Sequence, residues 1–312
     1  MSATYLVTGG AGFIGSHLVE ALVAAGQTVR VIDNFATGRP ENLAPFREHI
    51  TFYEVDITDR PALDEPFRGV DYVLHQAAIP SVPRSVDDPL GTHNANVTGT
   101  INVLDAARRA GVRRVVYAAS SSAYGEIAGE YKREDMLPQP LSPYAAAKLA
   151  GEYYCQAFYH VYGLETVALR YFNVFGPRQD PTSQYAAVIP LFITAMLQGR
   201  QPTIFGDGLQ SRDFTFVANV VHGNLLACTA PDAAGQVINL ACGESISLLE
   251  LVEAINAILG TNIRPLHAAP RPGDIKHSRA DISRARQLLG YTPQVSFQDG
   301  LARTVDFFHA GS

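Results

Sequence analysis

The beginning of the chain combines a strand, a glycine-rich turn and a helix, and this order restricts the fold more than any other feature. Thr4–Val7 is a short apolar run of β-prone residues, and Leu18–Ala25 repeats apolar residues with the period of a helix. Between them lies the pattern Gly-x-x-Gly-x-x-Gly, formed by Gly9, Gly12 and Gly15. Glycines permit a tight turn and let backbone N–H groups approach a pyrophosphate at the N-terminus of the helix. The sequence therefore predicts a loop that binds the phosphates of a dinucleotide.

The alternation of strands and helices continues along the first half of the chain. Further apolar runs predict strands over Gln27–Ile32, Thr51–Val55, Val70–His75 and Arg114–Ala119, and a helix that ends at Ala110. Strands that are apolar almost throughout and alternate with helices form a parallel sheet with both faces covered. The expected fold is therefore α/β, a doubly wound parallel sheet, in which ligands bind beyond the carboxyl ends of the strands.

Polar and small residues stand at the ends of these predicted strands. Asp33 ends the second strand, roughly 20 residues past the glycines, where a carboxylate accepts hydrogen bonds from adenosine ribose hydroxyls. Because this carboxylate would repel a 2′-phosphate, NAD is favoured over NADP. The stretch Asp56-Ile57 can hold the adenine amino group, and the small residues of Gln76-Ala77-Ala78 let a dinucleotide pass close by.

Tyr144 and Lys148 stand four residues apart, which on a helix places both side chains on one face, one turn apart. A fixed cation beside a phenol favours the phenolate and lowers the pKa of the tyrosine from about 10. Such a tyrosine can act as a general base or acid on a hydroxyl. Read alone, the pair also fits an ordinary helix with the tyrosine on its apolar side and the lysine in solvent.

Composition narrows the range of functions. The chain has 312 residues, 47% of them hydrophobic, which is enough for a sizeable core. The formal net charge is −6 and the basic residues are scattered, which argues against a nucleic-acid-binding surface. Cys155, Cys228 and Cys242 have neither metal-ligand spacing nor a disulfide pattern. No signal peptide or membrane-length apolar run is visible, so we expect a cytoplasmic protein without a membrane partner.

Ser120, Ser121 and Ser122 directly follow the predicted strand Arg114–Ala119. The glycine loop, Asp33, these serines and the pair Tyr144/Lys148 follow the order of the extended short-chain dehydrogenase/reductase superfamily, which the chain resembles over nearly its whole length. Within that superfamily it is most similar to the nucleotide-sugar 4-epimerases. The matching stretches are Gly9–His17, Ser120–Gly125, Ser142–Lys148, Arg170–Arg178, Gly206–Gly208, Arg212–Phe214 and Arg271–Asp274. The resemblance implies a catalytic role for the tyrosine and lysine.

The resemblance also implies roles for individual residues. Tyr144 is the base, Lys148 lowers its pKa and holds the nicotinamide ribose, and Ser120 shares a hydrogen bond with the reacting hydroxyl. The residues expected to bind NAD are Gly9, Gly12, Phe13, Ile14, Gly15, Asp33, Asn34, Thr37, Gly38, Asp56, Ile57, Gln76, Ala77, Ala78, Asn96, Tyr144, Lys148 and Phe172. Those expected to bind the UDP-sugar are Ser121, Ser122, Asn173, Ala187, Val188, Ile204, Phe205, Arg212, Arg271, Asp274 and Ser278.

After Asn173 the alternation breaks down, and prolines punctuate long loops between short helices. We therefore expect a NAD-binding Rossmann domain over residues 1–173. Residues 174–312 are expected to form a smaller, mainly substrate-binding domain, with some segments returning to the large sheet. One departure from the family pattern is Asn219, which stands where relatives carry an Asp and is expected to cap the next helix.

The absence of certain side chains limits the reaction that the resemblance implies. Dehydratases and UDP-glucuronate decarboxylases of the superfamily carry acids before Tyr-Gly, where this chain has Ser121-Ser122-Ala123. Uronate epimerases tend to place an Arg after Gly-Pro-Arg-Gln, where Asp180-Pro181 would repel a carboxylate. The remaining reaction oxidises a neutral sugar to a 4-keto intermediate and reduces it again from the other face, which inverts C4.

The position four residues after Asp274 bears on the substituent at C2 of the sugar. In the family a bulky aromatic there restricts the pocket to unsubstituted hexoses, whereas the small Ser278 leaves room for an N-acetyl group. The stretches Ser81–Ser85 and Arg178–Pro181 also look like epimerases that accept N-acetylated sugars. The expected substrate is UDP-N-acetylglucosamine, with some UDP-glucose activity. The alternatives are UDP-glucose as the main substrate, another nucleotide sugar, or a non-catalytic NAD-sensing scaffold.

Relatives pair through the helix that carries the catalytic tyrosine and the helix before Gly111, so a homodimer is expected. Apolar positions compatible with such a four-helix bundle are Leu104, Ala107, Ala147, Leu149, Tyr154 and Phe158. The same positions are equally compatible with burial on the sheet.

Overall fold

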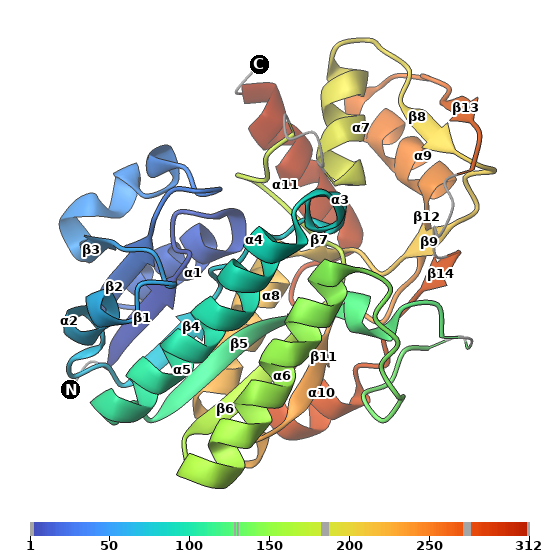
Figure 1. The fold of residues 1–312 in the computed structure, drawn as a ribbon. Helices are drawn as coiled ribbons and strands as arrows, with labels where there is room; N and C mark the ends of the chain where they lie inside the picture. Colours follow the sequence, from blue (N-terminus) through green and yellow to red (C-terminus); the bar gives the residue numbers. More distant parts are fainter. Residues whose placement is uncertain (1–2, 128, 130, 182–186, 271–275, 311–312) are drawn as a thin grey trace.

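A computed structural model describes residues 3–127, 129, 131–181, 187–270 and 276–310. Its large sheet is parallel and has the strand order β11-β6-β5-β4-β1-β2-β3 (Figure 1). The strands are β1 (Thr4–Thr8), β2 (Thr28–Asp33), β3 (Ile50–Glu54), β4 (Tyr72–His75), β5 (Arg114–Ser120), β6 (Glu165–Tyr171) and β11 (Val237–Leu240). The predicted α/β fold with a doubly wound parallel sheet is confirmed. Its strand order reverses beside β1, the place where such sheets bind ligands.

Both faces of the sheet are buried because the strands are apolar at successive positions. Leu6 and Val7 point to opposite faces, and neither is exposed to solvent. One face packs against α1 (Phe13–Ala24), α8 (Val217–Thr229) and α10 (Ser283–Leu289), and the other against α2 (Asp64–Phe67), α5 (Gly99–Ala110) and α6 (Pro143–Tyr162). This arrangement leaves the carboxyl edge of the sheet available for a ligand.

Helix α6 has well-defined ends. It begins at Pro143, a residue suited to the first turn, and the hydroxyl of Ser142 accepts a hydrogen bond from Ala145 N at 3.1 Å. It ends before Gly163, whose φ of +70° is left-handed. Throughout the described ranges, we find no helix with the combination of length and apolar character that a bilayer crossing requires.

Shorter segments connect these elements. Helices α3 (Val82–Asp87) and α4 (Pro89–His93) lead through a π-helical turn (Asn94–Thr98) into α5, and α3 and α4 both pack against α6. Short 3₁₀ segments occupy Pro40–Asn42, Ala44–His49, Pro61–Leu63, Ser121–Tyr124 and Pro231–Ala233. The segment Ser121–Tyr124 directly follows β5 at the carboxyl edge.

A smaller lobe with its own apolar core lies beyond this edge. Its helices are α7 (Val188–Leu197), α9 (Leu248–Leu259) and α11 (Phe297–Ala310). Its short strands are β7 (Val174–Phe175), β8 (Thr203–Phe205), β9 (Ser211–Arg212), β10 (Thr215–Phe216), β12 (Ile246–Ser247), β13 (Leu266–Ala268) and β14 (His277–Ser278), and they pair as β10-β7, β12-β9-β14 and β13-β8. The domain boundary at residue 173 stays a prediction. Strand β11 pairs with β6, so the later part of the chain contributes to the large sheet.

The side chain of Asn219 has a different role from the one that the sequence predicted. Helix α8 begins at Val217 after the N-cap Phe216, and no described side chain caps it. The Asn219 amide instead accepts hydrogen bonds from Gln294 N at 2.7 Å and Val295 N at 3.0 Å, and donates to Val295 O at 2.8 Å. The capping prediction was wrong because this residue lies inside the first turn, where it fastens the segment before α11.

Candidate active site

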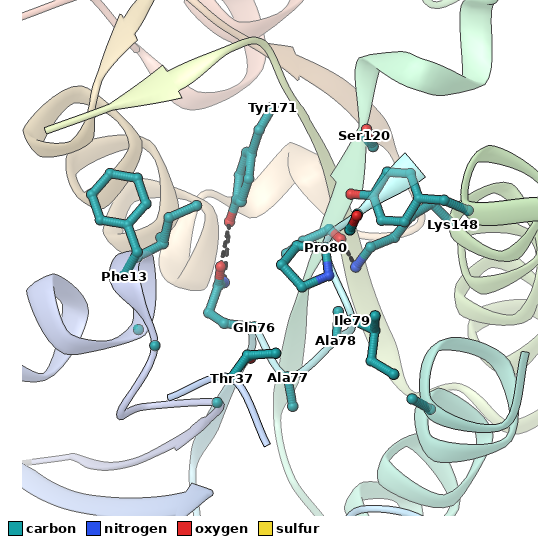
Figure 2. Close-up of a pocket in the computed structure, with 18 of the residues that line it drawn as sticks. Phe13, Thr37, Gln76, Ala77, Ala78, Ile79, Pro80, Ser120, Lys148 and Tyr171 are labelled. Carbon is teal, nitrogen blue, oxygen red and sulfur yellow. Dashed lines mark hydrogen bonds between the residues drawn. The ribbon is translucent and has the colours of Figure 1, made fainter. Parts of the chain in front are cut away.

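A cavity of about 1120 Å³ lies along the carboxyl edge of the large sheet. Its wall combines the loops after β1, β2, β4 and β5 with Ala187, Arg212 and Ser278 of the smaller lobe. Figure 2 shows Ser120 and Lys148 on one side of this cavity and Gln76 with Tyr171 on another. The folded chain thus brings the predicted catalytic residues and most of the predicted cofactor residues to one cavity.

The glycine loop turns sharply between β1 and α1. Gly9 has a φ of +70°, and a Cβ at this residue would lie 2.6 Å from the backbone N of Ala77. A Cβ on Gly15 would lie 2.1 Å from Gly9 O. No side chain in the described ranges caps α1, so the N–H groups of Phe13 and Ile14 remain available to a phosphate.

Asp33 supports this loop from the end of β2. Its carboxylate accepts hydrogen bonds from Ala11 N at 2.9 Å and from Phe35 N at 2.8 Å. A Cβ on Gly38 would lie 2.9 Å from both carboxylate oxygens, so glycine permits this close approach. Burial raises the pKa of Asp33, and the hydrogen bonds from backbone N–H groups oppose that effect. Asp33 also lines the cavity, where it can meet a ribose.

Two further polar residues stand at the neighbouring strand ends. The amide of Asn34 donates to Asp56 Oδ2 at 2.9 Å, while Asp56 Oδ1 accepts from both the backbone N and the hydroxyl of Thr58. Desolvation raises the pKa of Asp56, but these hydrogen bonds outweigh it and the net pKa is lowered. Asn34, Asp56, Ile57 and Thr37 all line the cavity.

The loop after β4 forms the floor of the cavity. Gln76 Nε2 donates to the Tyr171 hydroxyl at 3.1 Å (Figure 2). That hydroxyl donates to Asn224 Oδ1 at 2.9 Å. These bonds fix the Gln76 side chain against β6 and α8. Ala77 and Ala78 follow it along the wall and add little volume, as the sequence predicted.

The catalytic candidates meet where β5 ends and α6 begins. Ser120 and Tyr144 both line the cavity, and the Ser120 hydroxyl accepts a hydrogen bond from the Ser122 hydroxyl at 2.8 Å. The first turn of α6 is held from outside, because Tyr144 N donates to the buried Ser85 Oγ at 3.0 Å. Ser85 therefore helps to fix the position of Tyr144.

The pKa of Tyr144 differs from the sequence-based expectation. Burial raises its pKa, and the Ser120 side chain only partly offsets that effect. The Lys148 ammonium donates to Ala118 O at 2.9 Å, and burial lowers the pKa of Lys148 to about 8. The expected lowering of the tyrosine pKa by the lysine is therefore not found, because desolvation of the phenol dominates.

The predicted substrate residues divide into three groups. Ser121, Ser122, Asn173, Ala187, Arg212 and Ser278 line the cavity. Val188, Ile204 and Phe205 do not line it, and Ile204 is fully buried in the core of the smaller lobe because its side chain points to α7 and α9. Arg271 and Asp274 lie outside the described residues.

Two predicted cofactor residues are buried behind the cavity wall. Asn96 accepts from Ile79 N at 2.8 Å and donates to Ile79 O at 3.1 Å, so it shapes the loop after β4 instead of facing the cavity. Phe172 packs against Tyr124, with ring centroids 6.1 Å apart, and has no exposed surface. Motif position did not reveal the direction of either side chain.

Several cavity residues escaped sequence analysis. Tyr171, Tyr124 and Lys132 line the wall, as do Arg84 and Arg178. Tyr171 is the last residue of β6, so its place at the carboxyl edge was a usable signal. Lys132 is 3% exposed and comes from an irregular loop after β5, where no periodicity indicates direction.

These features fit NAD on geometric grounds. The glycine loop leaves no room for Cβ atoms beside an uncapped helix N-terminus, as the approach of a pyrophosphate requires. Asp33 at the end of β2 and Lys148 beside β5 line the same cavity, and β1 and β4 lie between those two strands in the sheet. The residues that would hold the cofactor are thus aligned along the sheet edge.

Comparison with known proteins gives concordant matches. Residues 5–241 match the model of the NAD dependent epimerase/dehydratase family. A UDP-glucose 4-epimerase of Mycolicibacterium smegmatis is 43% identical over 97% of both chains. A UDP-N-acetylglucosamine 4-epimerase from Methanobrevibacter ruminantium, in complex with UDP-N-acetylmuramic acid, superposes with a TM-score of 0.95 at 42% identity, covering 100% of both chains. A Thermus thermophilus UDP-glucose 4-epimerase with NAD has a TM-score of 0.90 and 38% identity, covering 99% of this chain and 100% of the other.

Substitution of Gly9 by Ala should weaken NAD binding by roughly tenfold or more, since each 1.4 kcal/mol of misfit costs a factor of ten. The added Cβ would meet the Ala77 backbone at 2.6 Å and displace the loop. Calorimetric titration of NAD into stripped protein measures the loss. Gly26→Ala is the matched control, because Gly26 has a φ of +67° but no atom within 4 Å of its Cβ position. Equal weakening in both variants would contradict the assignment.

Proposed function

The chain belongs to the NAD-dependent epimerase/dehydratase family, and from this membership we propose that it inverts C4 of a UDP-hexose through a 4-keto intermediate. It is an NAD-dependent enzyme. The single observation that carries the proposal is the meeting of Ser120, Tyr144 and Lys148 in the cavity that the glycine loop also lines. A non-catalytic scaffold would not need this complete set of side chains.

The protein side chains divide the work of proton transfer. NAD, when bound, would supply the hydride acceptor for the oxidation and, once reduced, the hydride donor for the reduction. Tyr144 takes the proton of the 4-hydroxyl and gives it back, since its side chain lines the same cavity as Ser120. Ser120 orients the reacting hydroxyl. Lys148 holds a positive charge beside the phenol and a ribose.

The chain contains no acid where a water elimination would need one. The positions before Tyr124 are Ser121, Ser122 and Ala123, and both serines line the cavity. Asp180, which was expected to repel a sugar carboxylate, forms an ion pair with Arg39 at 2.8 Å. Its charge is therefore partly neutralised, and the argument for a neutral sugar rests mainly on the absence of an Arg at this position.

We propose UDP-N-acetylglucosamine as the main substrate and UDP-glucose as a second one. Ser278 lies in β14, beside Arg212 of β9, and lines the same cavity as Tyr144 with a small side chain. The similar Methanobrevibacter enzyme is named for N-acetylglucosamine, whereas the Mycolicibacterium relative is named for glucose. UDP-glucose as the main substrate, or another nucleotide sugar, is the alternative. Arg212, Arg271 and Asp274 remain the predicted contacts of the UDP group.

We further propose that the chain forms a homodimer through α6. Most of the apolar residues that the sequence suggested for this interface are buried within the protomer. All five apolar residues of this set other than Tyr154 are at most 9% exposed, and Leu104, Ala107 and Phe158 belong to the core between the sheet and its helices. The outward face instead presents Tyr153, Tyr154, Val161 and Tyr162, each 39–70% exposed. Such a face of large apolar side chains is typical of a self-association surface. The cytoplasmic location stays a prediction from the sequence.

Tyr144→Phe should retain the fold and NAD but lose about 10²–10⁴-fold in turnover, because it removes only the proton acceptor. Circular dichroism and cofactor content report the first two properties, and a coupled assay reports the third. Tyr154→Phe on the same helix is the control and should keep full turnover. The role of Tyr144 as base would be disproved by a phenylalanine variant with most of its activity.

Wild-type protein should convert UDP-N-acetylglucosamine to UDP-N-acetylgalactosamine, and Ser278→Tyr should remove this activity before that on UDP-glucose. A tyrosine ring would occupy the space assigned to the N-acetyl group. Chromatographic separation of the products measures the conversion of UDP-N-acetylglucosamine and of UDP-glucose. Ser278→Ala is the control with a small side chain. Equal losses on the two sugars would contradict the gatekeeper role, and no product from UDP-N-acetylglucosamine would favour the alternative.

Tyr153→Glu should weaken dimerisation by about tenfold or more, since a two-fold interface would bury two new carboxylates. Sedimentation velocity over a concentration series measures the dissociation constant. Phe307→Glu is the matched control, because Phe307 is 44% exposed on α11. Unchanged association of the Tyr153 variant would exclude this face.

A further inference from the structure

A buried ion pair lies directly beneath the catalytic lysine. Glu152 follows Lys148 by one turn of α6, and its carboxylate is 1% exposed. Arg170 of β6 donates to it twice, from Nε to Oε1 at 2.9 Å and from Nη2 to Oε2 at 2.7 Å. The Arg170 side chain is 4% exposed, so solvent screens neither charge.

Stability alone is a weak reason for this pair. Removing two ions from water is costly, and well-packed apolar residues in their place are often equally stable. The same face of α6 meets the sheet through Cys155 and Phe158, which are buried and apolar. A carboxylate among them therefore calls for a role that an apolar side chain could not fill.

The surroundings of Lys148 show what that role is. Its ammonium is buried, donates to Ala118 O at 2.9 Å and lies 5.1 Å from the centroid of the Tyr117 ring. The other titratable groups around it are His75 of β4 and Tyr144, Glu152 and Cys155 of its own helix. Burial, followed by the charge of Lys148, lowers the pKa of His75 to about 3, so His75 is neutral. Among the groups described around Lys148, Glu152 supplies the carboxylate.

Arg170 holds that carboxylate in place and favours its ionised form. Burial raises the pKa of Glu152, and the two hydrogen bonds and charge of Arg170, followed by the charge of Lys148, only partly offset that effect. Arg170 is itself fixed, because its guanidinium lies 4.6 Å from the centroid of the Tyr124 ring. The Tyr124 hydroxyl donates to Asn239 Oδ1 at 2.6 Å, and Tyr124 lines the cavity.

We propose that Glu152, oriented by Arg170, is a positioning residue that keeps the Lys148 ammonium charged and fixed beside Tyr144 during proton transfer. This inference rests on the proposed function, in which Lys148 supports Tyr144. The order Lys148, Glu152, Arg170 alternates positive, negative and positive charge through the helix–sheet interface. A neutral residue at position 152 would leave the ammonium buried beside the second cation alone.

The charge of Glu152 determines the direction in which the pKa of Lys148 should change. A lysine ammonium is stabilised by a neighbouring anion, so loss of the Glu152 charge lowers the pKa at which Lys148 gives up its proton. Wild-type Lys148 should titrate at about 8. In Glu152→Gln the titration should move down by about 1 unit, the lower end of the effect of a close opposite charge. The alkaline limb of the kcat/KM profile should move in the same direction.

The chain contains only three lysines, Lys132, Lys148 and Lys276, so their titration can be followed directly by NMR with ¹³C-lysine. Lys148→Met assigns the signal, and Lys276, with a side chain 65% exposed, is the internal control. The inference predicts that only the Lys148 signal shifts in Glu152→Gln. An unchanged Lys148 titration would overturn it. This readout needs no substrate, so it is independent of the proposed activity.

A second variant separates electrostatics from folding. Glu152→Gln leaves Arg170 buried without its anion, whereas Glu152→Gln with Arg170→Gln replaces the ion pair by two neutral amides that can hydrogen-bond each other. The double variant should fold. In it, both the pKa of Lys148 and the alkaline pH at which kcat/KM declines should still be lower than in wild-type protein. A wild-type pKa of Lys148 in the double variant would overturn the inference. Glu152→Asp should keep the wild-type decline of kcat/KM at alkaline pH but have a lower kcat. Failure of wild-type protein to act on any UDP-hexose would count against the proposed function alone.

Discussion

The main constraint on this molecule is a parallel sheet whose two faces are both buried. Since strands such as β1 and β5 are apolar at successive positions, their polar neighbours can only stand beyond the strand ends. The glycine loop, Asp33, Gln76 and Ser120 all occupy such ends, although they come from separate parts of the chain. The cavity is thus a direct consequence of the sheet topology. The smaller lobe adds the wall that a flat sheet edge cannot provide.

The connection between the two lobes depends on buried polar side chains. Asp213 is fully buried and accepts hydrogen bonds from the backbone N–H groups of Cys242, Gly243 and Ala280. Burial raises the pKa of this carboxyl to about 6, while those three bonds oppose the effect. Asn219 makes a comparable set of bonds to the segment before α11. Both residues order loops that have no regular secondary structure. The positions of these loops determine the position of the cavity wall.

Sequence patterns were reliable where local geometry determines direction. The helix spacing of Tyr144 and Lys148 and the steric need for Gly9 and Gly15 can be deduced from the chain alone, and the folded sheet explains the place of Asp33. Patterns failed for Asn96, Phe172 and Ile204, because motif order does not state which way a side chain turns at a crowded edge. The pKa of Tyr144 could not be predicted either, since desolvation depends on residues that are distant in sequence.

Two buried arginines illustrate how position in the sheet decides the role of a charge. Arg114 begins β5, at the opposite edge from the cavity, and binds Glu165 together with the carbonyl oxygens of Ala227 and Ala230. Glu165 is 46% exposed, so that pair reaches solvent and simply ties α8 to the sheet. Arg170 is near the carboxyl end of β6, and its partner Glu152 is 1% exposed. Without solvent to screen it, the Glu152 charge also acts on a second buried cation, Lys148. An Arg–Glu ion pair thus ties elements together at one edge of the sheet, and a second such pair supports the charge of Lys148 at the other.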